Sequence, residues 1–451
     1  MHRFHLKSMG IAVGLVLAAV PPAAAQQAVP GTPFWEVLND STLDRLLTQA
    51  VRGNLDLRAA DARLDGAGAA RTHAALGLAP VVTASAGYTR QRMANAAFPG
   101  AGPGALPDRD LWSSALHASW EVDVAGRLRG RLRAENAFLS SAGEDLRSTR
   151  VAVAAAVAGT YFDLRGAQSR LAVAQRNAEN QRRTLELTVT RLEAGRGNAF
   201  DTERARAQLA TTLAAIPSLE AQVTALEQEL AVLLGRPPQE IAAELVPGDG
   251  IPALPDSLPA LAADQVIAAR PDVAAAEDRV AASRALASSA RSDYLPRLSI
   301  AASAGYVANE VDAFGRTGTF NYTVGPVLSW PLLDIGRVKA RVDAAQAQEL
   351  EARAQHEQLV LRAQAELESA TVGYRTARTR LEHLREAAQA SERAAELARL
   401  RYEGGIADFL QVLDAERTLL AAQDQLAQAE AQAAAAYVAL YRARGGVWSS
   451  R

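Results

Sequence analysis

Two very long helical segments, each ending in a glycine-containing turn, most constrain how this chain can fold. In the segment 337–403, apolar residues recur at every seventh position, a spacing that keeps one face of a helix against a partner in a left-handed coiled coil. These positions are Leu367, Tyr374, Leu381, Ala388, Ala395 and Tyr402. At about 1.5 Å per residue, such a helix is roughly 100 Å long. Gly404 and Gly405 predict its end in a left-handed cap, and a return helix is predicted over 407–444.

The same pattern occurs 210 residues earlier, which indicates a tandem duplication. The corresponding positions of the first copy are again apolar: Val157, Leu164, Leu171, Ala178, Leu185 and Leu192. Trp120 matches Trp330 at this offset, whereas Pro80 matches Pro296 at an offset of 216. The first copy therefore predicts a long helix over 127–193 and a return helix over 199–234.

The duplication divides the chain into five segments. They are an N-terminal segment 1–25, a first repeat 26–240, a proline-rich linker 241–260, a second repeat 261–444 and a tail 445–451. Each repeat is expected to begin with a shorter helical region, predicted over 43–64 and 261–280. A β-hairpin then precedes the long helix and the return helix.

The hairpins are predicted at about 81–122 and 297–332 because apolar and polar residues alternate there. Val82, Ala84 and Tyr88, for example, alternate with small polar residues. Alternation over about 10 residues with aromatics near the ends is the pattern of transmembrane β-strands. The alternation alone fits a half-buried periplasmic hairpin equally well.

The pattern of residues at the N-terminus predicts that the protein is exported. Basic residues precede an apolar run over 9–20 and a small-residue cleavage site near Ala25, as in a secretory signal peptide. That run is shorter than the roughly 20 residues of a membrane-spanning helix. No other stretch qualifies as one, so any membrane passage is expected to use strands. Four strands cannot close a barrel, for which about 8 is the lower limit, and a membrane location therefore requires several copies of the chain.

Composition excludes other classes of function. The formal net charge is −2, so no basic field for nucleic acid is expected. The absence of cysteine excludes disulfides and thiolate metal sites, and the six histidines are scattered. No nucleophile–base pair or phosphate-binding loop is found. We predict no catalytic, cofactor or metal site, and hence not an enzyme.

Specific motifs resemble the TolC-like outer-membrane efflux proteins, in particular those that serve resistance-nodulation-division drug pumps. The similarity extends from Phe34 to Leu440. The motifs that carry it are Trp120-Glu-Val-Asp-Val-Ala-Gly-Arg127, Tyr161-Phe-Asp-Leu-Arg165, Arg270-Pro-Asp-Val273, Trp330-Pro-Leu-Leu-Asp-Ile-Gly-Arg337 and Leu413-Asp-Ala-Glu-Arg417.

The resemblance implies an α+β membrane protein that forms a homotrimer. Its twelve-stranded transmembrane β-barrel would lie among outer-membrane lipids and continue into a twelve-helix periplasmic α-barrel. The implied partners are a periplasmic adaptor protein and an inner-membrane resistance-nodulation-division transporter. Members of this subgroup are often lipid-anchored at a cysteine after the signal peptide; this chain has none, so no such anchor is expected.

The resemblance also implies where the functional residues lie. The narrow periplasmic gate would be formed by Leu410, Asp414, Arg417, Tyr402 and Asp201. The tips that dock the adaptor would be formed by Gly195, Gly197, Asn198, Gly404, Gly405, Ile406 and Ala407. Asp414 and Arg417 are one helical turn apart, which alone also fits an ordinary solvated ion pair.

The function that the resemblance implies is a passive exit duct for drugs and other small amphiphiles. Two alternatives remain open from the residues themselves. One is the exit duct of a type I protein-secretion system, which would have the same fold. The other is a periplasmic coiled-coil scaffold without a pore.

Overall fold

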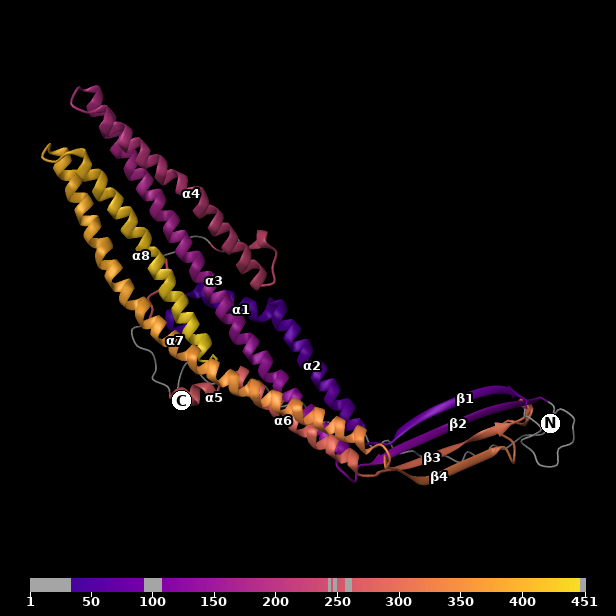
Figure 1. Cartoon of the computed structure of the whole chain (residues 1–451). Coiled ribbons are helices and arrows are strands. Elements are labelled where there is room, and N and C mark those ends of the chain that lie inside the picture. Colours follow the sequence, from indigo (N-terminus) through magenta and orange to yellow (C-terminus); the bar gives the residue numbers. More distant parts are fainter. Residues whose placement is uncertain (1–33, 93–107, 242–244, 246–249, 256–261, 447–451) are drawn as a thin grey trace.

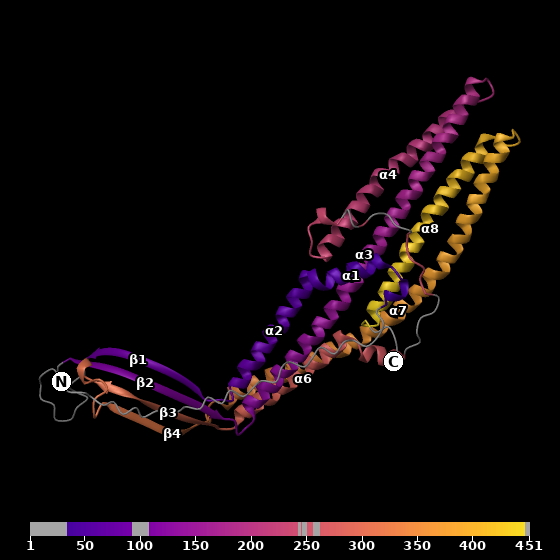
Figure 2. The ribbon, with the colours of Figure 1, turned by 180° about the vertical axis from the view of Figure 1, so that it is seen from behind.

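The computed structural model describes residues 34–92, 108–241, 245, 250–255 and 262–446. The predicted signal peptide, parts of the linker and residues 447–451 of the tail lie outside these residues. The chain forms a long bundle of helices with a four-stranded sheet at one end and two helical hairpin tips at the other (Figure 1). The same arrangement is seen from behind in Figure 2.

Each repeat contributes a leading helical pair, two strands and two long helices. In the first repeat these are α1 (Ser41–Gly53), α2 (Leu55–Leu76), β1 (Val81–Gln91), β2 (Arg109–Val122), α3 (Arg127–Glu193) and α4 (Ala199–Leu233). In the second they are α5 (Ala263–Ala268), α6 (Pro271–Arg291), β3 (Arg297–Ala308), β4 (Phe320–Ser329), α7 (Ile335–Glu403) and α8 (Phe409–Ala443). The predicted architecture of two repeats, four antiparallel strands and long coiled-coil helices in each chain is confirmed.

The long helices are held by the seams that the seven-residue spacing predicts. Val157, Leu164 and Ala178 of α3 are buried, as are Tyr374 and Ala388 of α7. Helix α3 packs along α4 and α8 toward the tips and along α2 and α6 toward the sheet. In the described part of the chain, no helix carries an apolar stretch long enough to cross a bilayer.

The leading helix differs from its predicted range. Instead of one helix over 43–64, α1 ends at Gly53 and α2 begins at Leu55. Asn54 causes the break, because its extended backbone is held by two side-chain hydrogen bonds. The Asn54 side chain accepts from the Leu57 N–H at 3.0 Å and donates to the Leu233 carbonyl at 2.8 Å. An N-cap residue of this kind satisfies the free N–H groups of the helix that it starts.

The sheet is open, with the order β1-β2-β3-β4 and antiparallel neighbours throughout. One face is apolar and exposed, with Val82, Leu116 and Tyr322 among its residues. The other face is polar: Ser85 Oγ lies 3.0 Å from His117 Nε2. Strands β1 and β4 form the two edges, and among the described residues neither has a partner on its outer side (Figure 1).

The main core lies at the middle of the molecule, where the segment that begins at Phe34 packs against the helical bundle. Phe34 stacks on Tyr441 with ring centroids 4.1 Å apart and receives a hydrogen bond of 3.0 Å from the Tyr437 hydroxyl on its carbonyl. The hydroxyl of Tyr161 donates to Asp40 Oδ2 at 2.6 Å. Burial, together with this hydrogen bond, raises the pKa of Tyr161 to about 12. The N-terminal lead is thus tied to helices of both repeats.

Arg270 forms a second anchor, between α6, α7 and the end of α8. Only 6% of the residue is exposed. Its guanidinium makes a two-pronged contact with Asp272 at 3.0 and 2.7 Å and also binds Glu366 at 2.9 Å. A further N–H donates to the carbonyl of Ala443 at 3.1 Å, which satisfies one of the unpaired carbonyls at the end of α8. The Arg-Pro-Asp motif therefore locks three helices together.

We expect Arg270→Ala to destabilise the folded chain by about 3–5 kcal/mol, because it leaves Asp272 half-buried without its counter-ion. Burial alone would raise the pKa of Asp272, but the Arg270 guanidinium outweighs it and lowers that pKa. The pair therefore stabilises the fold at neutral pH, and its contribution is lost as the pH falls below about 4.

The measurement is the midpoint of helix loss on heating, followed by circular dichroism at neutral and acid pH. Arg206→Ala, which breaks an exposed pair with Glu203, is the matched control and should change little. Equal midpoints for the two variants would contradict the assignment of Arg270 as an anchor.

Candidate functional site

The two hairpin tips lie at the same end of the bundle (Figure 1). Gly195 and Gly405 occupy equivalent positions and both have a left-handed conformation, with φ of 69° and 71°. The amide of Ile406 donates to the carbonyl of Arg401 at 2.8 Å, and Arg196 makes the matching bond at 2.9 Å. These bonds close each long helix in the way that glycine caps do. The left-handed cap falls on Gly405; Gly404 remains right-handed.

The remaining tip residues hold the turns and present small side chains. Asn198 caps α4, accepting from the Phe200 N–H at 2.9 Å. Gly197 lies so close to the backbone of Leu192 that a Cβ would come within 2.6 Å of its nitrogen. Ile406 is 74% exposed although it is apolar. The second tip thus carries an apolar side chain that nothing in the described chain covers.

Three of the predicted gate residues lie together on one face of α8. Leu410 is half exposed. Asp414 and Arg417 form an ion pair with Oδ1 and Nη2 3.3 Å apart, and about two thirds of each side chain is exposed. Pairs of this kind contribute about 0–1 kcal/mol and break easily.

Tyr402 and Asp201 come from helices other than that of the ion pair. The ring of Tyr402 is half-buried against Phe409, with centroids 5.7 Å apart. Asp201 lies in the first turn of α4. Within the described residues, no side-chain hydrogen bond or ion pair joins either of them to Asp414 or Arg417.

Arg191, near the end of α3, reaches across to the second hairpin and was not singled out from the sequence. Its guanidinium lies 4.1 Å from the centre of the Tyr402 ring. It also donates to the Tyr402 carbonyl at 3.1 Å, near the end of α7, which accepts from the Gly405 N–H at 3.0 Å as well. A cation over an aromatic ring is attracted by the ring quadrupole. The two tips are therefore connected through one side chain.

A buried carboxylate also connects the two hairpins. Glu416 of α8 is only 2% exposed. It accepts hydrogen bonds from Arg399 Nε of α7 and from Thr184 Oγ1 of α3, both at 2.9 Å. A buried charge is tolerated when it is paired and hydrogen-bonded in this way. A glutamate within an otherwise apolar seam, two residues after Asp414, was the available sequence signal.

We expect Glu416→Gln to lower stability by about 1–3 kcal/mol, because the amide cannot neutralise Arg399 and leaves a buried polar network incomplete. Heating followed by circular dichroism measures the loss, and the rate of tryptic cleavage at the tips reports local opening. Glu203→Gln removes a solvent-exposed charge of α4 and serves as the control. If both variants melt alike and are cleaved at the same rate, Glu416 does not hold the hairpins together.

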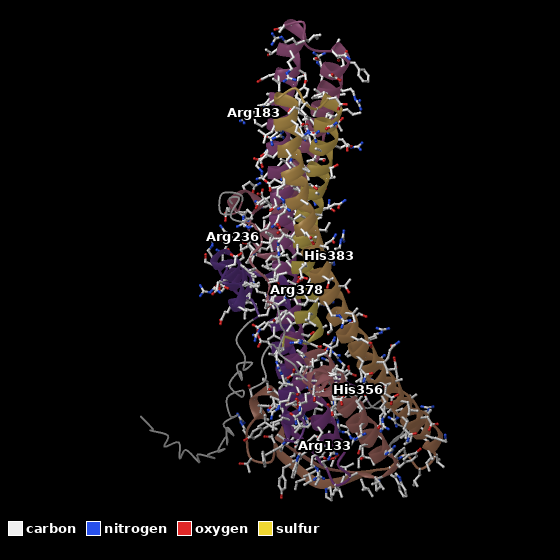
Figure 3. The ribbon with its side chains drawn as sticks, turned by 90° about the vertical axis from the view of Figure 1, so that its left-hand side faces the viewer. Arg133, Arg183, Arg236, His356, Arg378 and His383 are labelled. Atoms are coloured by element: carbon white, nitrogen blue, oxygen red, sulfur yellow. The ribbon has the colours of Figure 1, made fainter. Side chains whose placement is uncertain are left out.

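The described residues contain no cluster of histidine, aspartate and glutamate side chains that could hold a metal ion. Figure 3 shows His356 and His383 well separated along α7, among charged side chains that cover the outside of the bundle.

Comparisons with known proteins agree with this architecture. A family model described as outer membrane efflux protein matches residues 46–236 and 262–446. The pyoverdine export outer membrane protein OpmQ of Pseudomonas aeruginosa is 29% identical over 422 residues, covering 92% of this chain and 88% of that protein. The toluene efflux pump outer membrane protein TtgF of Pseudomonas putida is 28% identical over 418 residues, covering 92% and 86%.

A solved structure matches as well. The outer-membrane channel OprN is similar to this chain with a TM-score of 0.86 and 37% sequence identity, and the match covers 93% of each chain. The family model covers both repeats separately, as the duplication requires. This chain belongs to the outer membrane efflux protein family, the TolC-like efflux channels of the bacterial outer membrane.

Proposed function

We propose that three copies of this chain close into one duct, through which small amphiphiles delivered by an adaptor and an inner-membrane resistance-nodulation-division transporter leave the cell. The observation that carries this proposal is the open four-stranded sheet with an apolar outer face. In lipid, unpaired edge groups cost several kcal/mol each, so β1 and β4 need partners. Three sheets joined edge to edge give a closed ring of twelve strands.

The helices support the same closure. Helix α7 carries large apolar side chains on an outer surface that no helix of the described chain covers: Leu350, Leu361, Leu397 and Leu400. Exposed apolar residues repeated along one helix indicate a contact with another protein surface. In the proposed trimer, α7 of one subunit lies against α4 of the next, and the bundle continues the duct into the periplasm.

The tips are the proposed docking surface for the adaptor. Gly195, Gly197, Asn198, Gly404, Gly405, Ile406 and Ala407 form turns with small side chains and one exposed apolar residue. Such surfaces accept a partner hairpin without steric conflict. OpmQ and TtgF bear names that refer to pyoverdine export and to a toluene efflux pump. We extend to this chain only their shared feature, the export of small molecules, and take the cargo class to be small amphiphiles.

The proposed gate lies just behind the tips. In a threefold ring, Leu410 would form an apolar constriction, and the Asp414–Arg417 pairs would join neighbouring helices, with Asp201 and Tyr402 on adjoining surfaces. The observed ion pair is exposed and therefore weak. A docking adaptor could open it at little cost, while Arg191 and Glu416 keep the two hairpins of a subunit moving together.

We expect Asp414→Ala and Arg417→Ala each to raise single-channel conductance of the reconstituted protein, because each removes a side chain and an ion pair from the narrowest point. The measurement is the conductance in planar lipid bilayers. Asp343→Ala breaks the similarly exposed pair with Lys339, far from the tips, and should leave conductance unchanged. Unaltered conductance in both gate variants would place the constriction elsewhere.

We expect deletion of the encoding gene to sensitise the bacterium to several amphiphilic antibiotics and solvents, measured as minimum inhibitory concentrations. The wild-type gene should restore resistance. Ile406→Asp should fail to restore it although the protein still reaches the outer membrane, because a charge at the tip opposes apolar docking. Unchanged sensitivity of the deletion strain across the panel would refute the efflux role, and full rescue by Ile406→Asp would refute docking at this tip.

A further inference from the structure

The outermost strand β4 contains a proline, and the ladder shows which way its nitrogen points. The Val307 amide donates to the carbonyl of Thr319 at 2.9 Å, and the register of β3 and β4, continued by one residue beyond the pair Tyr306–Phe320, places these residues opposite each other. In an antiparallel pair, residues joined by hydrogen bonds alternate with residues that are not. Following the unbroken register from there, Ile300 and Pro326 form a pair without mutual bonds. The nitrogen of Pro326 therefore faces the free edge of the sheet.

The same alternation identifies both free edges. On β4, the outward backbone groups belong to Phe320, Tyr322, Val324, Pro326 and Leu328. On β1, they belong to Val82, Ala84, Ala86, Tyr88 and Arg90. Proline has no N–H, so the row of donors on β4 is interrupted at one place. Most of these edge residues also contribute to the apolar face of the sheet.

The two hairpins of the chain are structural copies of each other. Residues of β1 correspond to β3 at an offset of 216, and residues of β2 correspond to β4 at an offset of 210. With these offsets the β1–β2 register maps onto the β3–β4 register without a slip. The Trp120 indole donates to the Leu78 carbonyl at 2.9 Å, and its counterpart Trp330 donates to the Tyr294 carbonyl at 3.1 Å.

We propose that β4 of one subunit pairs with β1 of the next in the register that β2 and β3 use within the chain; this inference rests on the proposed trimeric closure. Within the chain, Ser119 faces Ala301. Ser329 corresponds to Ser119, and Ser85 corresponds to Ala301, so Ser329 faces Ser85 across the seam between subunits. Leu116 faces Ala304, so Pro326 faces Tyr88. The seam then lacks one hydrogen bond that the internal β2–β3 ladder has.

This register follows from two constraints. A slip by one residue would turn polar side chains of β1 or β4 toward lipid, because side chains alternate between the two faces. A slip by two keeps the faces but breaks the equivalence of the two repeats around the ring. Pro326 also limits pairing before assembly, since natural proteins use proline to blunt exposed strand edges. These constraints leave one register for the pairing of β4 with β1 of the next subunit.

Cysteine cross-linking tests the register directly, because the chain contains no cysteine of its own. Ser85 and Ser329 would form a pair without mutual hydrogen bonds, where Cα atoms are about 4.5 Å apart, within the range for a disulfide. We expect the double variant Ser85→Cys, Ser329→Cys to run as a covalent trimer on non-reducing gels after mild oxidation. The variant Ser85→Cys, Val327→Cys would be cross-linked if the register slipped by two residues. We expect it to give at least several-fold less covalent trimer.

An internal cysteine pair and chemical cross-linking serve as controls. The pair Ser119→Cys, Ala301→Cys should form a disulfide inside the chain, without a change in apparent mass, which verifies the oxidation. Efficient trimer formation by the slipped pair, or by neither pair in a protein that chemical cross-linking shows to be trimeric, overturns the register while the trimer stands. A protein that is not trimeric by chemical cross-linking overturns the proposed closure itself.

The missing bond gives an independent test. Pro326→Leu restores a backbone donor and introduces the residue found at the equivalent position Leu116. We expect the variant trimer to dissociate in detergent at a higher temperature than the wild type, by several degrees. Val324→Leu changes a neighbouring residue of the same face that already has its donor, and should have no such effect. Equal dissociation temperatures for both variants would show that β4 is not paired at Pro326.

Discussion

The unpaired edges of β1 and β4 are the constraint on which the rest of the structure depends. A sheet of four strands with one apolar face cannot remain open in lipid, because each unpaired N–H and C=O group would lose its hydrogen bonds to water. The duplicated hairpins carry matching edges at the two sides of the sheet. In the proposed trimer, further copies satisfy these edges, and the helices that follow each hairpin are placed around one axis. The pore of that trimer would be a consequence of backbone hydrogen bonding.

Along the bundle, the strength of the contacts changes with position. At the middle, Arg270 is buried and binds two carboxylates and a helix end, and Tyr161 and Tyr437 are buried in hydrogen-bonded positions. Toward the tips, Arg191 and Glu416 connect the hairpins through a few contacts, and Asp414 and Arg417 are paired in solvent. A bundle that is anchored at its middle and loosely joined at its end can move at the tip without unfolding.

Much of the fold was predictable from local patterns, and the exceptions have local causes. The long helices and the strands follow from apolar spacing, which depends only on which faces must be buried. The break at Asn54 was not predicted, because the residue is held by a hydrogen bond to Leu233, which is remote in sequence. Leu410, Asp414 and Arg417 share a face as their spacing requires, whereas the burial of Tyr402 depends on Phe409 and Arg191. Glu416 stood out in the sequence only as a charge within an apolar seam, and the roles of Glu416 and Arg191 became clear only from partners on other helices.

The sequence by itself determined the duplication, the long coiled-coil helices, the four alternating strands and the family, because each of these is written in spacings and motifs along the chain. The tertiary structure alone decided which hairpin lies beside which, which carboxylate is buried and which side of each strand is free. These properties depend on contacts between residues far apart in sequence. The direction in which the nitrogen of Pro326 points is such a property: it follows from the register of β3 and β4 and from one hydrogen bond at the end of their ladder.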